Sequence, residues 1–170
     1  MKIYDGSSAA AQQTRNRISV GIGELAVTTD DDRLISNGLG SCVGVALTDS
    51  ETGTRGLVHV MLPAEDGQRA RTPGKFADTG IVALIEEMEA EGADRESLRA
   101  RIAGGSDMLE FSNVNGGVGQ RNISAVRATL DEHDIPIVGE DVGGDYGRSL
   151  DFADSNELVI KTANGYDHTI

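Results

Sequence analysis

The sequence of 170 residues contains one cysteine, no tryptophan and no long hydrophobic run. A single cysteine cannot form an internal disulfide, so nothing in the cysteine content indicates an oxidising compartment. No segment approaches the roughly 20 apolar residues of a membrane span, and the N-terminus lacks the apolar core of a secretory signal. One cysteine and three scattered histidines form no metal-ligand pattern, and neither a dinucleotide-binding nor a Walker-type loop occurs. We expect a cytoplasmic protein with no membrane insertion, no metal and no cofactor.

Acidic residues dominate the charge balance. Asp and Glu number 28 against 15 Lys and Arg, which gives a formal net charge of −13. Binding of nucleic acid through a basic face is excluded, because neutralising phosphates requires clustered lysine and arginine. No acidic run is longer than residues 30–32, so the charge is spread over the surface. Widespread carboxylates with few lysines favour adaptation to high salt, where ions screen self-repulsion. The alternative is an ordinary acidic cytosolic protein.

Two amphipathic helices are expected from apolar residues at helical spacing. Asp78 or Thr79 is expected to cap the first helix, and Gly92 to end it. The second follows Gly119 and finishes near His133. Residues 115–119, with the sequence Asn-Gly-Gly-Val-Gly, precede this helix and fit either an anion-binding turn or a plain surface loop.

Alternating or continuous apolar residues predict the strands. These cover residues 18–27 with a bulge near Gly23, then 34–35, 43–48, 56–62, 98–103, 135–142, 149–152 and 158–162. Residues 1–16 are polar and alanine-rich without periodicity, which indicates a flexible N-terminal tail ahead of one domain over residues 17–165. The expected fold class is mixed α/β (α+β), a single-domain sandwich of β-sheet with flanking helices.

A glycine-rich turn leads into the cysteine. Residues 36–45 read Ser-Asn-Gly-Leu-Gly-Ser-Cys-Val-Gly-Val. Gly38 and Gly40 accept positive φ at little steric cost, and Ser41 is too small to block approach to Cys42. A side chain at the junction of a tight turn and a strand is held in place yet remains reachable, which favours a nucleophile. The alternative is structural, because free cysteine commonly packs as a small hydrophobe.

Among the three histidines, His59 is the candidate partner of Cys42. His133 and His168 are expected to be solvated, whereas His59 lies in an apolar strand joined to the strand after Cys42 by a short turn. Such a hairpin places residues near 42 and 59 opposite each other, and a neighbouring imidazole activates a thiol. A structural role for a histidine in an apolar strand is the alternative. Ser36, expected to be partly exposed, supplies a hydroxyl that either orients the ring or only satisfies the turn backbone.

Several short motifs together resemble CheD, the chemoreceptor glutamine deamidase family of bacterial and archaeal chemotaxis. They occur in the family's order from about Ile18 to Ile160. The motifs are Gly38-Leu39-Gly40-Ser41-Cys42-Val43, His59-Val60-Met61-Leu62-Pro63, Pro73-Gly74-Lys75-Phe76-Ala77-Asp78, Ile102-Ala103-Gly104-Gly105, Arg121-Asn122, Glu140-Asp141-Val142-Gly143-Gly144 and Arg148-Ser149. With the acidic composition, this resemblance points to a haloarchaeal source.

The resemblance implies a cysteine hydrolase that converts glutamines of chemoreceptors to glutamate and releases ammonia. It also implies binding to the phosphatase CheC. Carried over by position, Cys42 is the nucleophile, His59 the base and then the acid, and Ser36 stands where the family usually has threonine. Backbone N–H groups of the turn Gly40, Ser41 and Cys42 then stabilise the oxyanion.

The segment containing Lys75, Phe76 and Asp78 is the expected substrate or partner loop. Two other functions remain open at this point. One is a non-catalytic docking regulator of the phosphatase, and the other is a cysteine amidase for small substrates. A closed pocket of roughly 300–1,000 Å³ suits small substrates, whereas an open groove suits receptor helices.

Overall fold

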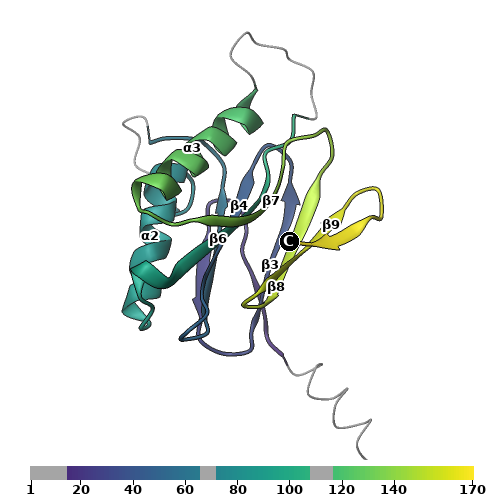
Figure 1. The fold of residues 1–170 in the computed structure, drawn as a ribbon. Helices are drawn as coiled ribbons and strands as arrows, with labels where there is room; N and C mark the ends of the chain where they lie inside the picture. Colours follow the sequence, from purple (N-terminus) through teal and green to yellow (C-terminus); the bar gives the residue numbers. More distant parts are fainter. Residues whose placement is uncertain (1–14, 66–71, 108–116) are drawn as a thin grey trace, which may run out of the picture.

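The computed structural model describes residues 15–65, 72–107 and 117–170. Within these residues, two five-stranded sheets and two α-helices form three layers, with one sheet lying between the helices and the other sheet (Figure 1). This confirms the expected fold class, a mixed α/β sandwich with flanking helices. Most of the expected N-terminal tail lies outside the described residues, as do residues 115 and 116 of the Asn-Gly-Gly-Val-Gly segment. The polar segment over residues 64–74, which the sequence indicates to be a loop, also lies mostly outside them.

The outer sheet has the order β1-β3-β8-β9-β10, and the middle sheet has the order β2-β5-β4-β6-β7. The strands are β1 (Arg17–Ser19), β2 (Leu25–Thr28), β3 (Arg33–Leu39), β4 (Val43–Asp49), β5 (Thr54–Val60), β6 (Leu98–Gly104), β7 (Ile137–Val142), β8 (Arg148–Asp154), β9 (Glu157–Thr162) and β10 (Asp167–Thr169). The helices are α2 (Ala77–Ala90) and α3 (Val118–Glu132), with a short 3-10 turn η1 (Arg95–Ser97).

Alternation along the middle sheet divides the core in two. Val43, Val45 and Leu47 of β4 pack toward the helices, in a cluster that includes Ile81 of α2 and Ile123 of α3. Cys42 and Ala46 belong instead to the cluster between the two sheets, with residues of β3 and β8. Successive residues of a strand face opposite sides, so every second residue near Cys42 points into the space between the sheets.

The single strand predicted over residues 18–27 is wrong. The segment forms two strands in different sheets: β1 runs parallel to β3, and β2 runs antiparallel to β5. A turn separates them, in which Gly23 has φ of 78° and the Gly21 N–H donates to Glu24 Oε1 at 2.8 Å. The turn, rather than a bulge, carries the chain from one sheet to the other.

The two predicted helices are confirmed, with corrected starts. Phe76 is the N-cap of α2 and provides no side-chain cap, while Asp78 lies in the first turn. The Asp78 carboxylate accepts the backbone N–H groups of Glu65 and Thr79. Gly92 ends this helix region with φ of 102°. Helix α3 begins at Val118, slightly before the expected start.

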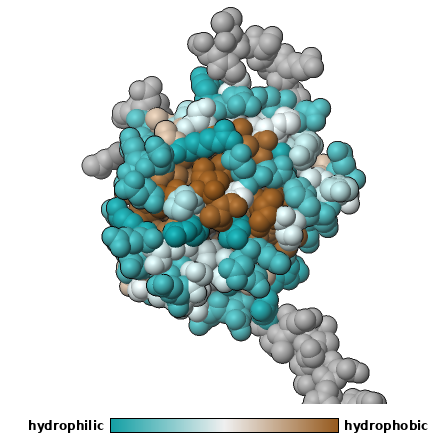
Figure 2. All heavy atoms as spheres, in the orientation of Figure 1, coloured by the Kyte–Doolittle hydropathy of each residue, from teal (hydrophilic) through white to brown (hydrophobic). Residues whose placement is uncertain are grey.

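The strands predicted over residues 149–152 and 158–162 are confirmed as β8 and β9, which pair as an antiparallel hairpin, and β10 was not predicted. β10 pairs with β9, which extends the outer sheet beyond the expected domain boundary at residue 165. On the face shown in Figure 2, hydrophobic residues gather at the centre and hydrophilic residues surround them. β7 is an edge strand of the middle sheet, and its residue Val138 is 52% exposed. No helix among the described residues is long and apolar enough to cross a membrane.

Candidate active site between the two sheets

The β4–β5 hairpin places Cys42 and His59 on the same face of the middle sheet. The antiparallel register pairs His59 with Gly44 and Val43 with Val60. Cys42 precedes Gly44 by two residues and therefore faces the same side as His59. The predicted hairpin is confirmed, and the residue directly opposite His59 is Gly44 rather than Cys42. This diagonal arrangement turns both side chains toward the outer sheet.

Ser36 reaches His59 from the outer sheet. Ser36 lies on β3, and its Oγ is 2.8 Å from His59 Nδ1 and 2.8 Å from the Val20 carbonyl oxygen. The Val20 oxygen is also 3.4 Å from His59 Nδ1. A carbonyl only accepts, so the Ser36 hydroxyl donates to Val20 and accepts from His59 Nδ1–H. This chain of hydrogen bonds assigns the Nδ1–H tautomer and leaves Nε2 with a lone pair.

The ring of His59 is held without solvent contact. His59 and Ser36 are both 0% exposed, so Ser36 is not the partly exposed residue that the sequence suggested. Burial lowers the pKa of His59, opposed by its contact with the Val20 carbonyl and by the charge of Glu24. His59 Nε2 is buried and has no hydrogen-bond partner within the described part of the chain. His59 is therefore a neutral base with one free nitrogen.

Cys42 is close to the surface but mostly covered, at 8% exposure. Burial raises the pKa of its thiol, and its own backbone N–H lowers it by a smaller amount. Cys42 and His59 form no hydrogen bond with each other in this structure, as the unpartnered Nε2 shows. Catalytic hydrogen bonds are often long in a substrate-free structure and tighten only when substrate is bound.

Three successive carbonyl groups of the turn around Cys42 are held by donors from distant segments. The Gly40 oxygen accepts from Ser106 N–H at 2.9 Å and the Cys42 oxygen accepts from Gly105 N–H at 2.8 Å. The Ser41 oxygen accepts from Asn122 Nδ2 at 2.8 Å. Sequence reasoning did not single out Asn122 as a site residue, although the pair Arg121-Asn122 is one of the motifs on which the resemblance rests.

The predicted loop of Lys75, Phe76 and Asp78 lies against the end of β5. The Lys75 carbonyl accepts the backbone N–H groups of Met61 and Leu62 at 2.9 and 3.0 Å. Phe76 is buried and forms a parallel bridge with Leu62. This segment therefore adjoins the strand end that follows His59, with Asp78 inside α2.

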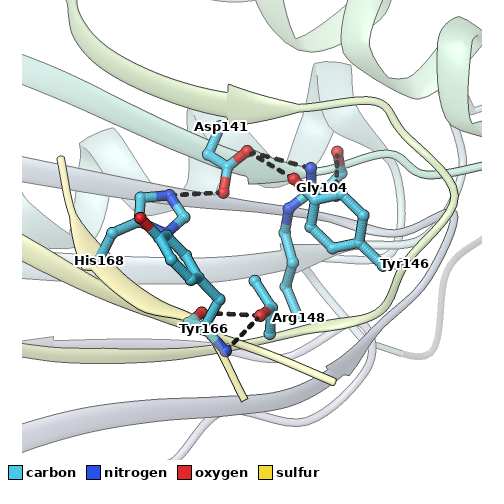
Figure 3. Close-up of polar contacts among 7 residues, drawn as sticks. Gly104, Asp141, Tyr146, Arg148, Tyr166 and His168 are labelled. Carbon is cyan, nitrogen blue, oxygen red and sulfur yellow. Dashed lines mark hydrogen bonds and ion pairs between the residues drawn. The ribbon is translucent and has the colours of Figure 1, made fainter. Parts of the chain in front are cut away.

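A second polar cluster lies beside the turn and was not predicted. Asp141 on β7 accepts from Arg148 Nη2 at 3.1 Å and from the Tyr146 hydroxyl at 3.4 Å, and pairs with His168 Nε2 at 2.9 Å (Figure 3). Arg148, which is almost completely buried, also contacts the Gly104 carbonyl at 3.4 Å. His168 is thus not simply solvated, as the sequence suggested, but ties β10 to β7.

The same cluster lines a cavity of about 520 Å³. Its walls are Asp141, Tyr146, Thr162, Asn164, Tyr166 and His168. Neither Cys42 nor His59 contributes to these walls, so this cavity gives no support to a small-substrate amidase. The described residues also contain no group of three or more His, Cys, Asp or Glu side chains arranged to hold a metal ion.

Comparisons with known proteins agree on one family. A family model described as CheD chemotactic sensory transduction matches residues 61–162. A probable chemoreceptor glutamine deamidase CheD of Haloarcula marismortui is 52% identical, over 96% of each chain. One of Natronomonas pharaonis is 39% identical, over 95% of this chain and 97% of the relative.

Similarity extends to bacteria. The chemoreceptor glutamine deamidase CheD of Bacillus licheniformis is 42% identical, over 85% of this chain and 89% of the relative. Among solved structures, the hypothetical protein YfiH of Bacillus licheniformis matches with a TM-score of 0.46 and 17% identity, covering 69% of this chain and 49% of that chain.

Proposed function

Because the chain belongs to the CheD family, we propose that it is a chemoreceptor glutamine deamidase, a hydrolase that converts receptor glutamines to glutamate with release of ammonia. The observation that carries the proposal is the grouping of Cys42, His59 and Ser36 between the two sheets. Ser36 accepts the Nδ1–H of His59, which leaves His59 Nε2 free to take a proton. Cys42 is the nucleophile, His59 the base and then the acid, and Ser36 orients His59.

The reaction follows from these groups. As the sulfur of Cys42 attacks the carboxamide carbon, its proton passes to His59 Nε2. The tetrahedral intermediate then collapses, the C–N bond breaks, and His59 returns the proton so that ammonia leaves. Water, deprotonated by His59, hydrolyses the resulting thioester to glutamate and the free thiol. Backbone N–H groups of Ser41 and Cys42 are the donors proposed for the oxyanion.

The pKa shifts of the two groups define the starting state. Burial raises the pKa of Cys42 and lowers that of His59, so at neutral pH the thiol keeps its proton and the imidazole is neutral. Proton transfer therefore accompanies the attack, and no thiolate–imidazolium pair is formed in advance. The Nδ1–H to Ser36 hydrogen bond stabilises the imidazolium that forms during the attack.

Two exposed apolar side chains support a macromolecular substrate. Met61, two residues after His59, is 39% exposed. Ile22, at 57% exposure, precedes Gly23, whose N–H donates to the His59 carbonyl. Apolar side chains beside a nearly covered nucleophile suit the face of a receptor helix better than a small amide.

Three further assignments complete the proposal. The protein acts in the cytoplasm, and it binds a CheC-type phosphatase in addition to chemoreceptors. Its deamidase domain covers the expected residues 17–165 together with β10, which pairs with β9. Lys75, Phe76 and Asp78 belong to the segment proposed to contact substrate or partner. A docking regulator without catalysis is the competing function, and the intact Cys42, His59 and Ser36 arrangement favours the enzyme.

Mass spectrometry of receptor peptides tests the proposal directly. Purified protein is incubated with a cytoplasmic receptor fragment, and glutamine-to-glutamate conversions are located from their mass increase while released ammonia is measured in parallel. We expect conversion by the natural protein and none by Cys42→Ala, whose folding is checked by circular dichroism. Conversion by folded Cys42→Ala would contradict the proposed enzyme. So would a natural protein that converts no glutamine either with its phosphatase partner or without it.

A further inference from the structure

Asn122 connects helix α3 to the turn that carries Cys42 and to the residue that follows β5, the strand that carries His59. Its side chain is completely buried. Nδ2 donates to the Ser41 carbonyl at 2.8 Å and to the Met61 carbonyl at 2.9 Å. These two bonds use both hydrogens of the amide. The orientation of the amide is fixed by them, since the opposite orientation would place Oδ1 against two carbonyl oxygens.

The bond to Ser41 determines the direction of an N–H group at the reacting centre. The Ser41 carbonyl and the Cys42 N–H belong to one peptide unit, which is planar and trans, so they point in opposite directions. With the carbonyl held by α3, the Cys42 N–H points away from that helix. The influence of this N–H on its own thiol, whose pKa it lowers, agrees with that direction.

We propose that Asn122 is a positioning residue of this active site: by holding the Ser41 carbonyl, it aims the Cys42 N–H at the reacting sulfur and at the oxyanion of the substrate. The inference rests on the deamidase function proposed above. Asn122 does not itself contact the substrate. Within the described residues, no backbone carbonyl of another residue accepts the Cys42 N–H, so this donor remains directed at its own thiol and is available to the reaction.

The bond to Met61 gives the same side chain a second effect. Met61 follows His59 by two residues, and its N–H is held by the Lys75 carbonyl. One amide therefore fixes the end of β5 relative to the turn that carries Cys42. Helix α3 is a firm support for it, because Ile123 and Val126 on the same helix are buried in the core.

Alkylation of Cys42 tests the inference without any receptor substrate. Because Cys42 is the only cysteine, the rate of iodoacetamide modification against pH reports this thiol alone. We expect Asn122→Ala to move the profile to higher pH, so that at a fixed neutral pH the rate falls about tenfold, as a change of one pKa unit implies. In the deamidase assay, kcat should fall by at least about 10-fold, with little change in KM. The upper limit is the 10²–10³-fold loss that is typical of removing an oxyanion donor outright.

Thr129→Ala is the matched control. Thr129 is another buried polar residue of α3, and among the residues that the structure describes its hydroxyl bonds only to the Ala125 carbonyl in its own helix. We expect Thr129→Ala to leave the alkylation profile and kcat at their natural values. An unchanged profile in Asn122→Ala, or equal shifts in the two variants, would overturn the inference. Loss of deamidation in Cys42→Ala, together with a shifted alkylation profile in Asn122→Ala, supports both proposals. A shifted profile in Asn122→Ala without any deamidation by the natural protein refutes the deamidase function and leaves the positioning role of Asn122 standing.

If Asn122→Ala does not fold, NMR of the natural protein decides the question. Slow exchange of the Asn122 Nδ2 hydrogens, with chemical shifts that follow the titration of Cys42, supports the coupling through the Ser41 peptide. Fast exchange, or shifts that do not respond to the thiol, refutes it.

Discussion

Removing the hydroxyl of Ser36 separates its two roles, in folding and in orienting His59. In Ser36→Ala, the Val20 carbonyl loses a donor at 2.8 Å and His59 Nδ1–H loses its acceptor. Both groups are buried with Ser36, which is 0% exposed. Leaving a buried donor or acceptor without a partner costs about 1–3 kcal/mol. The variant should therefore melt at a lower temperature than the natural protein while remaining folded.

The catalytic effect is limited by a second acceptor. The Val20 carbonyl lies 3.4 Å from His59 Nδ1, and in the absence of the hydroxyl the ring can donate to it after a small movement. The movement displaces Nε2 from the position that serves Cys42. If the full 1–3 kcal/mol appeared in the transition state, kcat would fall by roughly 5- to 150-fold. Because the Val20 carbonyl retains the Nδ1–H tautomer, we expect a loss in the lower part of this range, about tenfold.

Ser36→Thr is the matched control for this experiment. It keeps the hydroxyl and adds the methyl that restricts χ1, and threonine is the residue usual at this position in the resembled family. Deamidation kinetics and melting curves are measured for both variants. We expect Ser36→Thr to retain activity. A kcat near the natural value in folded Ser36→Ala would show that Cys42 and His59 act as a dyad and would remove Ser36 from the site.

Three further predictions follow from charge and burial. Because burial lowers the pKa of His59, the unfolded chain takes up a proton at this residue at a higher pH than the folded chain does. The free energy of unfolding should therefore decrease as pH falls through the ordinary histidine range near pH 6.5. Thermal melts between pH 8 and 5 measure this decrease, and a His59→Gln variant should show a weaker dependence on pH. Melting temperature should rise between low and molar salt, because the −13 net charge is screened over about 3 Å at 1 M, and a flat response would contradict salt adaptation. Arg148→Met should cost about 3–5 kcal/mol in chemical denaturation by leaving Asp141 without its buried partner, whereas Arg127→Met, which breaks an exposed pair, should cost about 0–1 kcal/mol.

Local signals in the sequence were sufficient for most elements. Apolar spacing identified both helices, and the apolar residues Ile123, Val126 and Leu130 of the second are buried. The β4–β5 hairpin followed from two apolar runs joined by a short turn. These features depend on neighbours along the chain, and so a single sequence carries them.

Features that depend on contacts between distant segments were missed. Residues 18–27 alternate like one strand, but alternation is the same whether a chain continues or crosses to another sheet at Gly23. The complete burial of Ser36 arises because β3 belongs to the sheet that covers the middle one. The contact between Asn122 and Ser41 spans 81 positions, and nothing in either local sequence indicates it.

The construction of the turn explains how a nucleophile can be both buried and usable. A covered thiol with a raised pKa is poorly reactive toward oxidants and alkylating agents, because the thiolate is the reactive form. The carbonyl oxygens of Gly40 and Ser41 are engaged by other segments, so the Ser41 and Cys42 N–H groups of the same two peptides are directed away from those contacts. A substrate carboxamide placed there meets donors that need no rearrangement, and this preorganisation offsets the cost of forming charge in a dry site. In the proposed reaction, the burial that keeps Cys42 protonated at rest also strengthens each hydrogen bond to the oxyanion, so the cysteine reacts only when substrate is bound.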